Sequence, residues 1–197
     1  MAPTDAGTVL LPIARAAIAG ALGRHLVTDE SAPWLQEPGA CFVTLIQHGR
    51  LRGCIGSLEA RRSLLDDVKA NAQAAAFHDS RFSPLTAPEL EGTEVEVSLL
   101  SALEPMTFDS EAGALAQLRP GIDGVLLEYG RHRSTFLPQV WEQLPQATQF
   151  IAHLKSKAGL PAGFWHKDVR LQRYTVSKWS EAANRSGAAD ALKSGPA

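Results

Sequence analysis

Two strand-like segments separated by one short turn constrain this fold more than any other feature of the chain. Cys41–Gln47 and Arg50–Gly56 have the length and apolar content of strands, and only His48-Gly49 separates them. A loop of two residues joins antiparallel strands, whereas parallel strands need a crossover of a dozen residues or more. The sequence therefore predicts an antiparallel β-hairpin over residues 41–56.

Helices and strands alternate along the rest of the chain. Apolar residues at helical spacing predict helices over residues 8–24, 63–78, 110–118 and 147–158. Alternating residues predict strands over residues 93–100 and 169–176 and a second hairpin over residues 124–137, which turns at Arg131-His132. Because these elements do not form regular strand–helix–strand units, the pattern favours an α+β fold, an antiparallel sheet with packed helices.

The composition is typical of a soluble globular protein. The chain has 197 residues, 45% of them hydrophobic, and a formal net charge of −2, so we expect no nucleic-acid partner. No apolar run approaches the roughly 20 residues that span a bilayer, and the first residues lack the basic region of a secretory signal. We therefore expect a cytoplasmic protein with no membrane contact and, from its Ala/Gly/Ser-rich sequence, a disordered tail over residues 182–197.

The first hairpin is expected to bring Arg52 and Cys54 onto one face. With a two-residue loop and a regular ladder, Val43 lies opposite Cys54 and Leu45 lies opposite Arg52. Alternation then separates a face with Cys41, Val43, Leu45, Arg52 and Cys54 from a mostly apolar face, which we expect to be the core. The expected core face comprises Phe42, Thr44, Ile46, Leu51 and Ile55.

The two cysteines are not expected to form a disulfide. In this register Cys41 and Cys54 are diagonal neighbours roughly 7 Å apart, which is too far for an unstrained bridge. Cys41 has no charged neighbour in the sequence and is predicted to be a core residue. The six histidines lack the spacing of metal ligands, so no metal site and no cofactor are predicted.

Cys54 is the leading candidate for a functional residue. Gly53 and Gly56 flank it in a strand, where glycine is unfavourable unless a backbone or a ligand approaches closely. Arg52 would stabilise the thiolate and bind an anionic group of a small ligand. The alternatives are a small buried cysteine, a solvated arginine and a β-bulge at Gly56.

Three further residues are candidates for the same site. Glu96 is expected to pair with Arg52 or to assist the thiol. His78 ends a predicted helix, where histidine usually acts as a C-terminal cation; it would serve as a base for Cys54 if the fold brings the two together. Arg81 is expected either to tie its loop to a carboxylate or to bind a ligand.

The signature segment, residues 51–56 (LRGCIG), together with Ser57-Leu58-Glu59, resembles the signature of the AMMECR family. Further matching segments follow in order: AF at 76–77, DSRF at 79–82, PLT at 84–86, EVEVS at 94–98, GIDG at 121–124, FLPQVW at 136–141 and KAG at 157–159. Ser57 and Ser83 are small departures, because relatives often carry threonine and proline there. The resemblance covers nearly the whole chain except its tail.

This resemblance implies one domain over residues 1–181 with two unequal lobes. The larger lobe would be formed by both chain ends, the smaller would lie within about residues 57–92, and a cleft would lie near the signature segment. Prokaryotic relatives are encoded beside a Memo-type protein, which is related to dioxygenases, and a radical-SAM protein, so both are candidate partners. The resemblance implies no particular reaction.

Three functions are compatible with these features. In the first, the signature segment centres a cleft that binds a small anionic ligand, and Cys54 with Arg52 forms a thiol-dependent catalytic group. In the second, the segment is a non-catalytic docking surface for the Memo-type or the radical-SAM protein. In the third, it is chiefly structural, a twisted hairpin that requires glycine.

Overall fold

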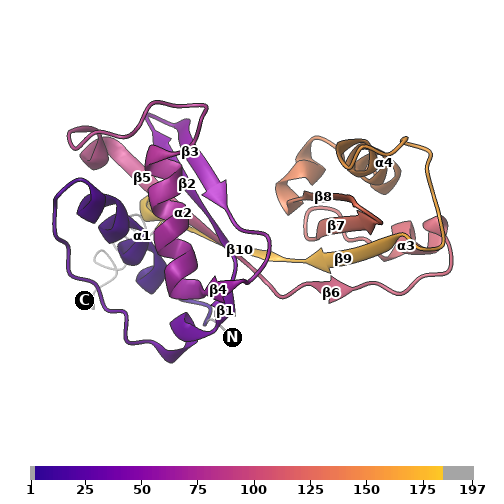
Figure 1. The fold of residues 1–197 in the computed structure, drawn as a ribbon, viewed down its shortest axis with the longest axis horizontal. Helices are drawn as coiled ribbons and strands as arrows, with labels where there is room; N and C mark the ends of the chain where they lie inside the picture. Colours follow the sequence, from indigo (N-terminus) through magenta and orange to yellow (C-terminus); the bar gives the residue numbers. More distant parts are fainter. Residues whose placement is uncertain (1–2, 184–197) are drawn as a thin grey trace, which may run out of the picture. The chain divides into compact units, whose positions relative to one another are not determined.

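The computed structural model describes residues 3–183, which form two compact units. Among the described residues, the larger unit comprises residues 3–100 and 177–183, and the smaller unit comprises Ser101–Val176. Each unit contains antiparallel strand pairs and packed helices (Figure 1). The α+β class and a larger unit formed by both chain ends are thus confirmed. Most of the tail expected over 182–197 lies outside the described residues.

The expected position of the smaller lobe, within residues 57–92, is wrong. That stretch contains helix α2 (Leu64–Phe77), whose buried residues Leu64, Val68 and Ala72 belong to the core of the larger unit. An amphipathic helix must bury its apolar face against another element, and the nearest sheet is that of the same unit. The smaller unit is instead formed by Ser101–Val176.

The larger unit is a four-stranded sheet with helices against one face (Figure 1). Its strand order is β10 (Val176–Ser180), β5 (Thr93–Leu100), β2 (Cys41–Gln47) and β3 (Arg50–Gly56), so β3 is an edge strand. Helices α1 (Gly7–Ala21) and α2 pack together on this sheet. The unit also contains the short strands β1 (Pro38–Gly39) and β4 (Arg62–Ser63) and the 3-10 turns η1 (Pro33–Gln36) and η2 (Glu89–Gly92).

Local sequence signals set the boundaries of these elements. Helix α2 begins after Ser63, whose hydroxyl accepts the Asp66 N–H at 3.1 Å, as an N-cap does. The β2–β3 turn has positive φ at both residues, 52° at His48 and 73° at Gly49, as primed two-residue turns require. The predicted first hairpin and second helix are therefore confirmed.

A β-bulge at Arg52 changes the register of the hairpin. Leu45 lies opposite Gly53 and Thr44 lies opposite Cys54, so Arg52 is an extra residue on β3. Without the bulge, each of these β2 residues would lie opposite the β3 residue one position earlier in the sequence, so that Leu45 would face Arg52. The expected register is therefore wrong beyond the first pairs, because one inserted residue exchanges the two faces for the rest of the strand.

The expected core face of β2 is also wrong. Cys41, Val43 and Leu45 are fully buried in the core with α1 and α2, whereas Phe42, Thr44 and Ile46 are only half-buried on the other face. Both sets are largely apolar, so alternation alone could not identify the buried one. The core position of Cys41 is confirmed, and both cysteines are free because they lie on opposite faces.

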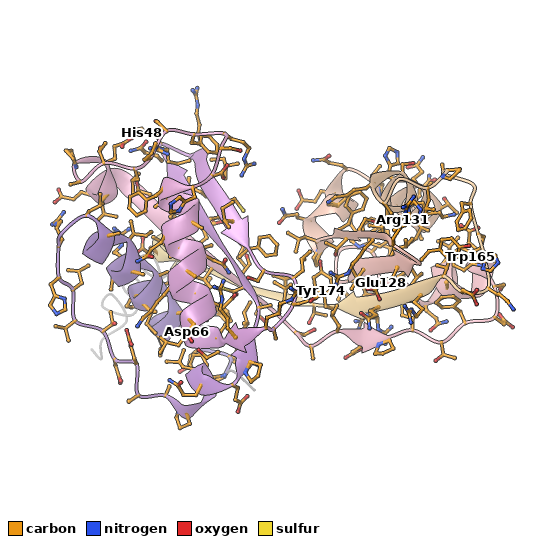
Figure 2. All side chains as sticks on the ribbon, in the orientation of Figure 1. His48, Asp66, Glu128, Arg131, Trp165 and Tyr174 are labelled. Carbon is orange, nitrogen blue, oxygen red and sulfur yellow. The ribbon has the colours of Figure 1, made fainter. Side chains whose placement is uncertain are left out.

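The smaller unit is a second four-stranded sheet with its own core. Its strand order is β6 (Glu104–Pro105), β9 (Arg170–Tyr174), β7 (Gly124–Tyr129) and β8 (His132–Phe136). Helices α3 (Glu111–Gln117) and α4 (Ala147–Lys157) and the 3-10 turn η3 (Pro138–Glu142) complete it. Its core includes a stacked pair, Trp141 and Phe150, with ring centroids 3.9 Å apart. Side chains of both units are drawn in Figure 2.

Two boundaries differ from expectation here. The second hairpin turns at Gly130-Arg131, one residue earlier than predicted, because Gly130 supplies the positive φ (56°). The last predicted strand, 169–176, is two strands: β9 pairs with β7 in the smaller unit, and β10 joins the sheet of the larger unit. Within residues 3–183, no helix combines the length and apolarity needed to cross a membrane.

Candidate functional site

The Cys54 thiol is half-buried and has a hydroxyl group beside it. Its Sγ lies 3.3 Å from Oγ1 of Thr44, the residue directly opposite on β2. The other thiol, Cys41, is fully buried, and burial raises its pKa far above the ordinary value. Cys54 is therefore the cysteine that a reagent or a ligand can approach.

The loop after α2 binds the outer edge of β3 at Cys54. The Asp79 carboxylate accepts the Cys54 N–H at 2.9 Å, and the Arg81 guanidinium donates to the Cys54 carbonyl at 3.3 Å. These two side chains satisfy the N–H and the C=O of one residue of an edge strand, where backbone groups otherwise lack partners. The position of the Cys54 backbone thus depends on the loop.

Asp79 and Arg81 form a bidentate ion pair. The guanidinium donates to the two carboxylate oxygens at 2.9 and 2.7 Å, and the Arg81 N–H donates at 3.2 Å. Hydrogen bonds from Arg81, then from Cys54, lower the pKa of the buried Asp79 carboxyl well below its ordinary range, although burial opposes this shift. The pKa of Arg81 is raised, mainly by Asp79 and to a lesser degree by the Cys54 thiolate charge.

Arg52 has a different environment from the thiol. Its buried guanidinium donates to Glu89 of η2 at 3.4 Å, and its Nη1 atom has no hydrogen-bond partner among the described residues. Glu89 is also bound by the hydroxyl and N–H of Thr86, which lower its pKa more than Arg52 does. The arginine that interacts electrostatically with Cys54 is therefore Arg81.

The glycines of the signature segment are required by contacts within the protein. A Cβ atom on Gly53 would lie 2.1 Å from the carbonyl oxygen of Ala75 in α2. A Cβ atom on Gly56 would lie 2.2 Å from the Phe42 ring. Close approach does explain both glycines, as their positions in a strand suggested, but the approaching groups are a helix backbone and an aromatic ring.

Of the two remaining candidates, Glu96 lies in one row with Cys54, whereas His78 is exposed at the end of α2. Glu96 lies opposite Thr44 in the β2–β5 ladder, so Cys54, Thr44 and Glu96 form one row across three strands. Its carboxylate pairs with Lys178 of β10 at 2.6 Å. His78 is exposed at the end of α2, and its ring has no hydrogen-bond partner within residues 3–183.

Three residues of this site were not singled out by the sequence: Thr44, Asp79 and Lys178. Thr44 lies on a strand that the sequence only identified as apolar, and its pairing with Cys54 depends on the bulge. Asp79 could have been recognised from its spacing with Arg81, because an aspartate often caps the turn that follows it. No sequence pattern relates Lys178 to Glu96.

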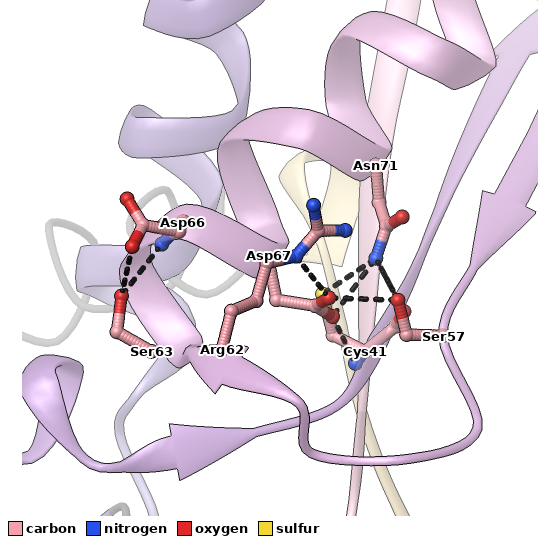
Figure 3. A network of polar contacts seen from close by, with 7 residues as sticks. All are labelled: Cys41, Ser57, Arg62, Ser63, Asp66, Asp67 and Asn71. Atoms are coloured by element: carbon pink, nitrogen blue, oxygen red, sulfur yellow. Dashed lines mark hydrogen bonds and ion pairs between the residues drawn. The ribbon is translucent and has the colours of Figure 1, made fainter.

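A second polar cluster near the signature segment is structural (Figure 3). The buried Asp67 carboxylate accepts from the Cys41 N–H, the Ser57 hydroxyl, Arg62 and Asn71 at 2.7–2.9 Å. It joins the beginning of β2, the residue after β3 and the first turns of α2. Because both carboxylate oxygens are satisfied by the protein, this cluster holds the hairpin against the helix.

Comparison with known proteins identifies the family. The model of the AMMECR1 family matches residues 11–179. This chain belongs to the AMMECR1 family. The match includes the signature segment, the Asp79–Arg81 loop and the whole of the smaller unit. No group of three or more His, Cys, Asp or Glu side chains able to hold a metal ion occurs in the described part of this AMMECR1-family chain.

Relatives match over nearly their whole length. A protein of Methanothermobacter thermautotrophicus is 36% identical over 187 residues, which cover 90% of this chain and 95% of the relative. Protein MJ0810 of Methanocaldococcus jannaschii is 34% identical, with 92% of each chain covered. The crystal structure of the uncharacterized protein PH0010 from Pyrococcus horikoshii is similar, with a TM-score of 0.77, 30% identity and coverage of 90% and 92%. These comparisons establish the family and the fold.

Proposed function

We propose that this AMMECR1-family protein binds a small anionic molecule beside the Cys54 thiol, which acts as the reactive group of the site. The observation that carries the proposal is the half-buried Cys54 thiol, 3.3 Å from the Thr44 hydroxyl and backed by the Arg81 guanidinium at its own carbonyl. A thiol becomes a nucleophile as its thiolate, which hydroxyl donors and nearby cations stabilise.

Each residue has a distinct role in this proposal. Thr44 donates its hydroxyl to the sulfur, and Arg81 supplies positive charge toward both the thiolate and an anionic ligand group. Asp79 is a positioning residue, because it binds both the Cys54 N–H and the guanidinium. Arg52 pairs with Glu89 and so supports the bulge. In this proposal it has no part in the thiol chemistry that was expected from the sequence.

Paired alkylating reagents test this proposal. Iodoacetate and iodoacetamide both transfer a carbon to the thiolate with loss of iodide, but only iodoacetate is an anion. We expect the iodoacetate-to-iodoacetamide rate ratio at Cys54 to exceed that of glutathione by about fivefold, the effect of roughly 1 kcal/mol of charge attraction. Arg81→Gln should remove this excess, whereas Thr44→Val should slow both reagents equally.

Two variants serve as controls. Cys54→Ala leaves only the buried Cys41, and it should not be labelled without denaturant. Arg61→Gln removes an exposed arginine that pairs with Glu59, and it should keep the wild-type ratio. A ratio equal to that of glutathione, or labelling of Cys54 only after denaturation, would contradict the proposal.

The exposure of Leu51 supports a second candidate function. Leu51 is 45% exposed on the edge strand β3, and an exposed apolar residue on an edge strand is a feature of docking surfaces. The partner would be a Memo-type or a radical-SAM protein. In a pull-down, Leu51→Asp should abolish association and Cys54→Ser should keep it. Arg52→Glu is unsuitable for this test, because it would bury a second acid beside Glu89.

A further inference from the structure

A hollow lies on the smaller unit, at one end of its sheet. It has a volume of about 710 Å³ and is lined by Tyr129, Gly130, Lys167, Asp168 and Arg170. Tyr129 ends β7, Gly130 opens the β7–β8 turn and Arg170 begins β9, so the hollow lies where the β7–β9 ladder ends. Its volume falls within the range of small-molecule sites, and none of its residues belongs to the site at Cys54.

Within residues 3–183, the cations of this hollow form no ion pair. The side chains of Lys167 and Arg170 make no hydrogen bond or ion pair within residues 3–183. The same holds for the side chain of Arg131 in the adjacent turn, which Figure 2 labels. Elsewhere in the same unit cations are paired: Arg119 with Asp123 and Lys155 with Glu111, both at 2.6 Å. The unpaired charges are therefore concentrated around the hollow.

One acidic side chain lines the hollow. The Asp168 carboxylate lies 3.4 Å from Nδ1 of His166, and the backbone N–H of Asp168 donates to the same nitrogen at 3.2 Å. Against this single carboxylate stand the ammonium of Lys167 and the guanidinium of Arg170. The lining therefore has a net positive charge and favours an anion.

Tyr129, which lines the hollow, packs against other aromatic rings. The Tyr129 ring packs against Phe164, with centroids 4.8 Å apart, and against the His166 ring at 5.3 Å. The His132 ring is stacked with the Tyr129 ring, with centroids 6.5 Å apart. Gly130 presents no side chain, and no atom lies within 4 Å of the place where a Cβ would be. A ligand can thus approach the backbone beside a rigid aromatic surface.

We infer that this hollow is a binding site for a small organic anion, in which a phosphate or carboxylate group is joined to a flat apolar body. Lys167 and Arg170 bind the charged group, since ammonium and guanidinium groups both donate to phosphate and carboxylate oxygens. Tyr129 supplies the surface for the flat body. This inference is independent of the function proposed for Cys54, because the two sites share no residue.

Titrations of the full chain followed by amide NMR shifts test the inference. The probes are phenyl phosphate, benzoate, inorganic phosphate and phenol. Phenyl phosphate, benzoate or both should bind more tightly than inorganic phosphate and phenol, and the shifts should be confined to residues 128–131 and 164–170. The stronger of the two aromatic anions identifies the charged group that the site prefers.

Charge variants give the sharper readout. Lys167→Gln and Arg170→Gln should each weaken the binding of the stronger probe by about fivefold, as expected for one partly exposed charge contact. Asp168→Asn should have the opposite effect and strengthen binding. Arg24→Gln, which removes an exposed arginine of the larger unit, is the matched control and should change nothing.

Three results would contradict a binding site for an organic anion in this hollow. Shifts elsewhere in the chain, unchanged affinity in the Lys167→Gln, Arg170→Gln double variant, or equal binding of phenol and phenyl phosphate would overturn the inference. Since these side chains are exposed, the variants are expected to fold. Variant amide spectra that match the wild type across the smaller unit verify this. A failed titration here leaves the alkylation test of Cys54 unaffected, so the two proposals can fail separately.

Discussion

The Asp79 carboxylate accepts the backbone N–H of Cys54 at 2.9 Å, although the two residues lie 25 positions apart. The same carboxylate holds the Arg81 guanidinium, which donates to the Cys54 carbonyl. One aspartate therefore fixes both the strand that carries the thiol and the cation beside it. The relationship joins an edge strand, the loop that covers it and the proposed chemistry.

Asp79→Asn should lower the free energy of unfolding at pH 7 by about 1.5–3 kcal/mol, the range for hydrogen bonds to a charged group. The pKa of Asp79 is lowered in the folded protein. Its stabilisation is therefore complete above the unfolded pKa, about 3.9, and is lost as the pH falls from there toward the folded pKa. Urea unfolding should show a smaller difference between wild type and variant at pH 3 than at pH 7.

The exposed carboxylate of Asp168 provides a control for that experiment. Asp168→Asn removes one negative charge without removing a buried hydrogen bond, so its stability should match the wild type at both pH values. A difference between Asp79→Asn and wild type that stays constant from pH 7 to pH 3 would contradict the assigned role of the Asp79 charge.

Gly53→Ala should destabilise the larger unit by more than about 2 kcal/mol. The new methyl group would lie 2.1 Å from the Ala75 carbonyl oxygen, so α2 or β3 must move. Gly20→Ala is the matched control, because Gly20 lies within α1 with no atom near the new methyl group. It should stabilise the protein by up to about 1 kcal/mol. Thermal unfolding of both variants measures this contrast, and equal effects would disprove the contact.

Removing the Glu89 carboxylate should destabilise the protein more than removing the Arg52 guanidinium. Glu89→Gln leaves the buried guanidinium without its counter-ion and should cost about 1–2 kcal/mol. Arg52→Met removes a guanidinium whose Nη1 is already without a hydrogen-bond partner, and Glu89 keeps its bonds to Thr86. We expect this variant to cost less than Glu89→Gln in urea unfolding. The reverse order would show that Arg52 contributes net stability.

Tyr174 should ionise at a higher pH than an ordinary tyrosine. Burial raises its pKa to about 12, partly offset by the hydrogen bond with Thr135. The proton is therefore held more tightly in the folded state, and stability falls as the pH rises from about 10 through 12, by roughly 2–3 kcal/mol. Ultraviolet titration of Tyr129→Phe, which retains only Tyr174, should show ionisation near pH 12 or on alkaline unfolding. Reversible ionisation near pH 10 would contradict the buried position.

Local patterns in the sequence were sufficient for most individual elements. The His48-Gly49 turn, the Ser63 cap of α2 and the alternation of β5 are governed by a few neighbouring residues, and each was predicted. The family was also recognised from ordered short segments. These features depend on backbone preference and side-chain periodicity, which a sequence displays directly.

The composition of the site was decided by tertiary structure. The bulge at Arg52 has no sequence marker, and it pairs Cys54 with Thr44 and turns Arg52 toward Glu89. The ion pair of Asp79 with Arg81 reaches Cys54 only because α2 returns the chain to the edge of β3. The sequence by itself determined the hairpin, its glycines and its thiol. Only packing against α2 decided which residues surround that thiol, because a one-residue change of register exchanges the two faces of a strand.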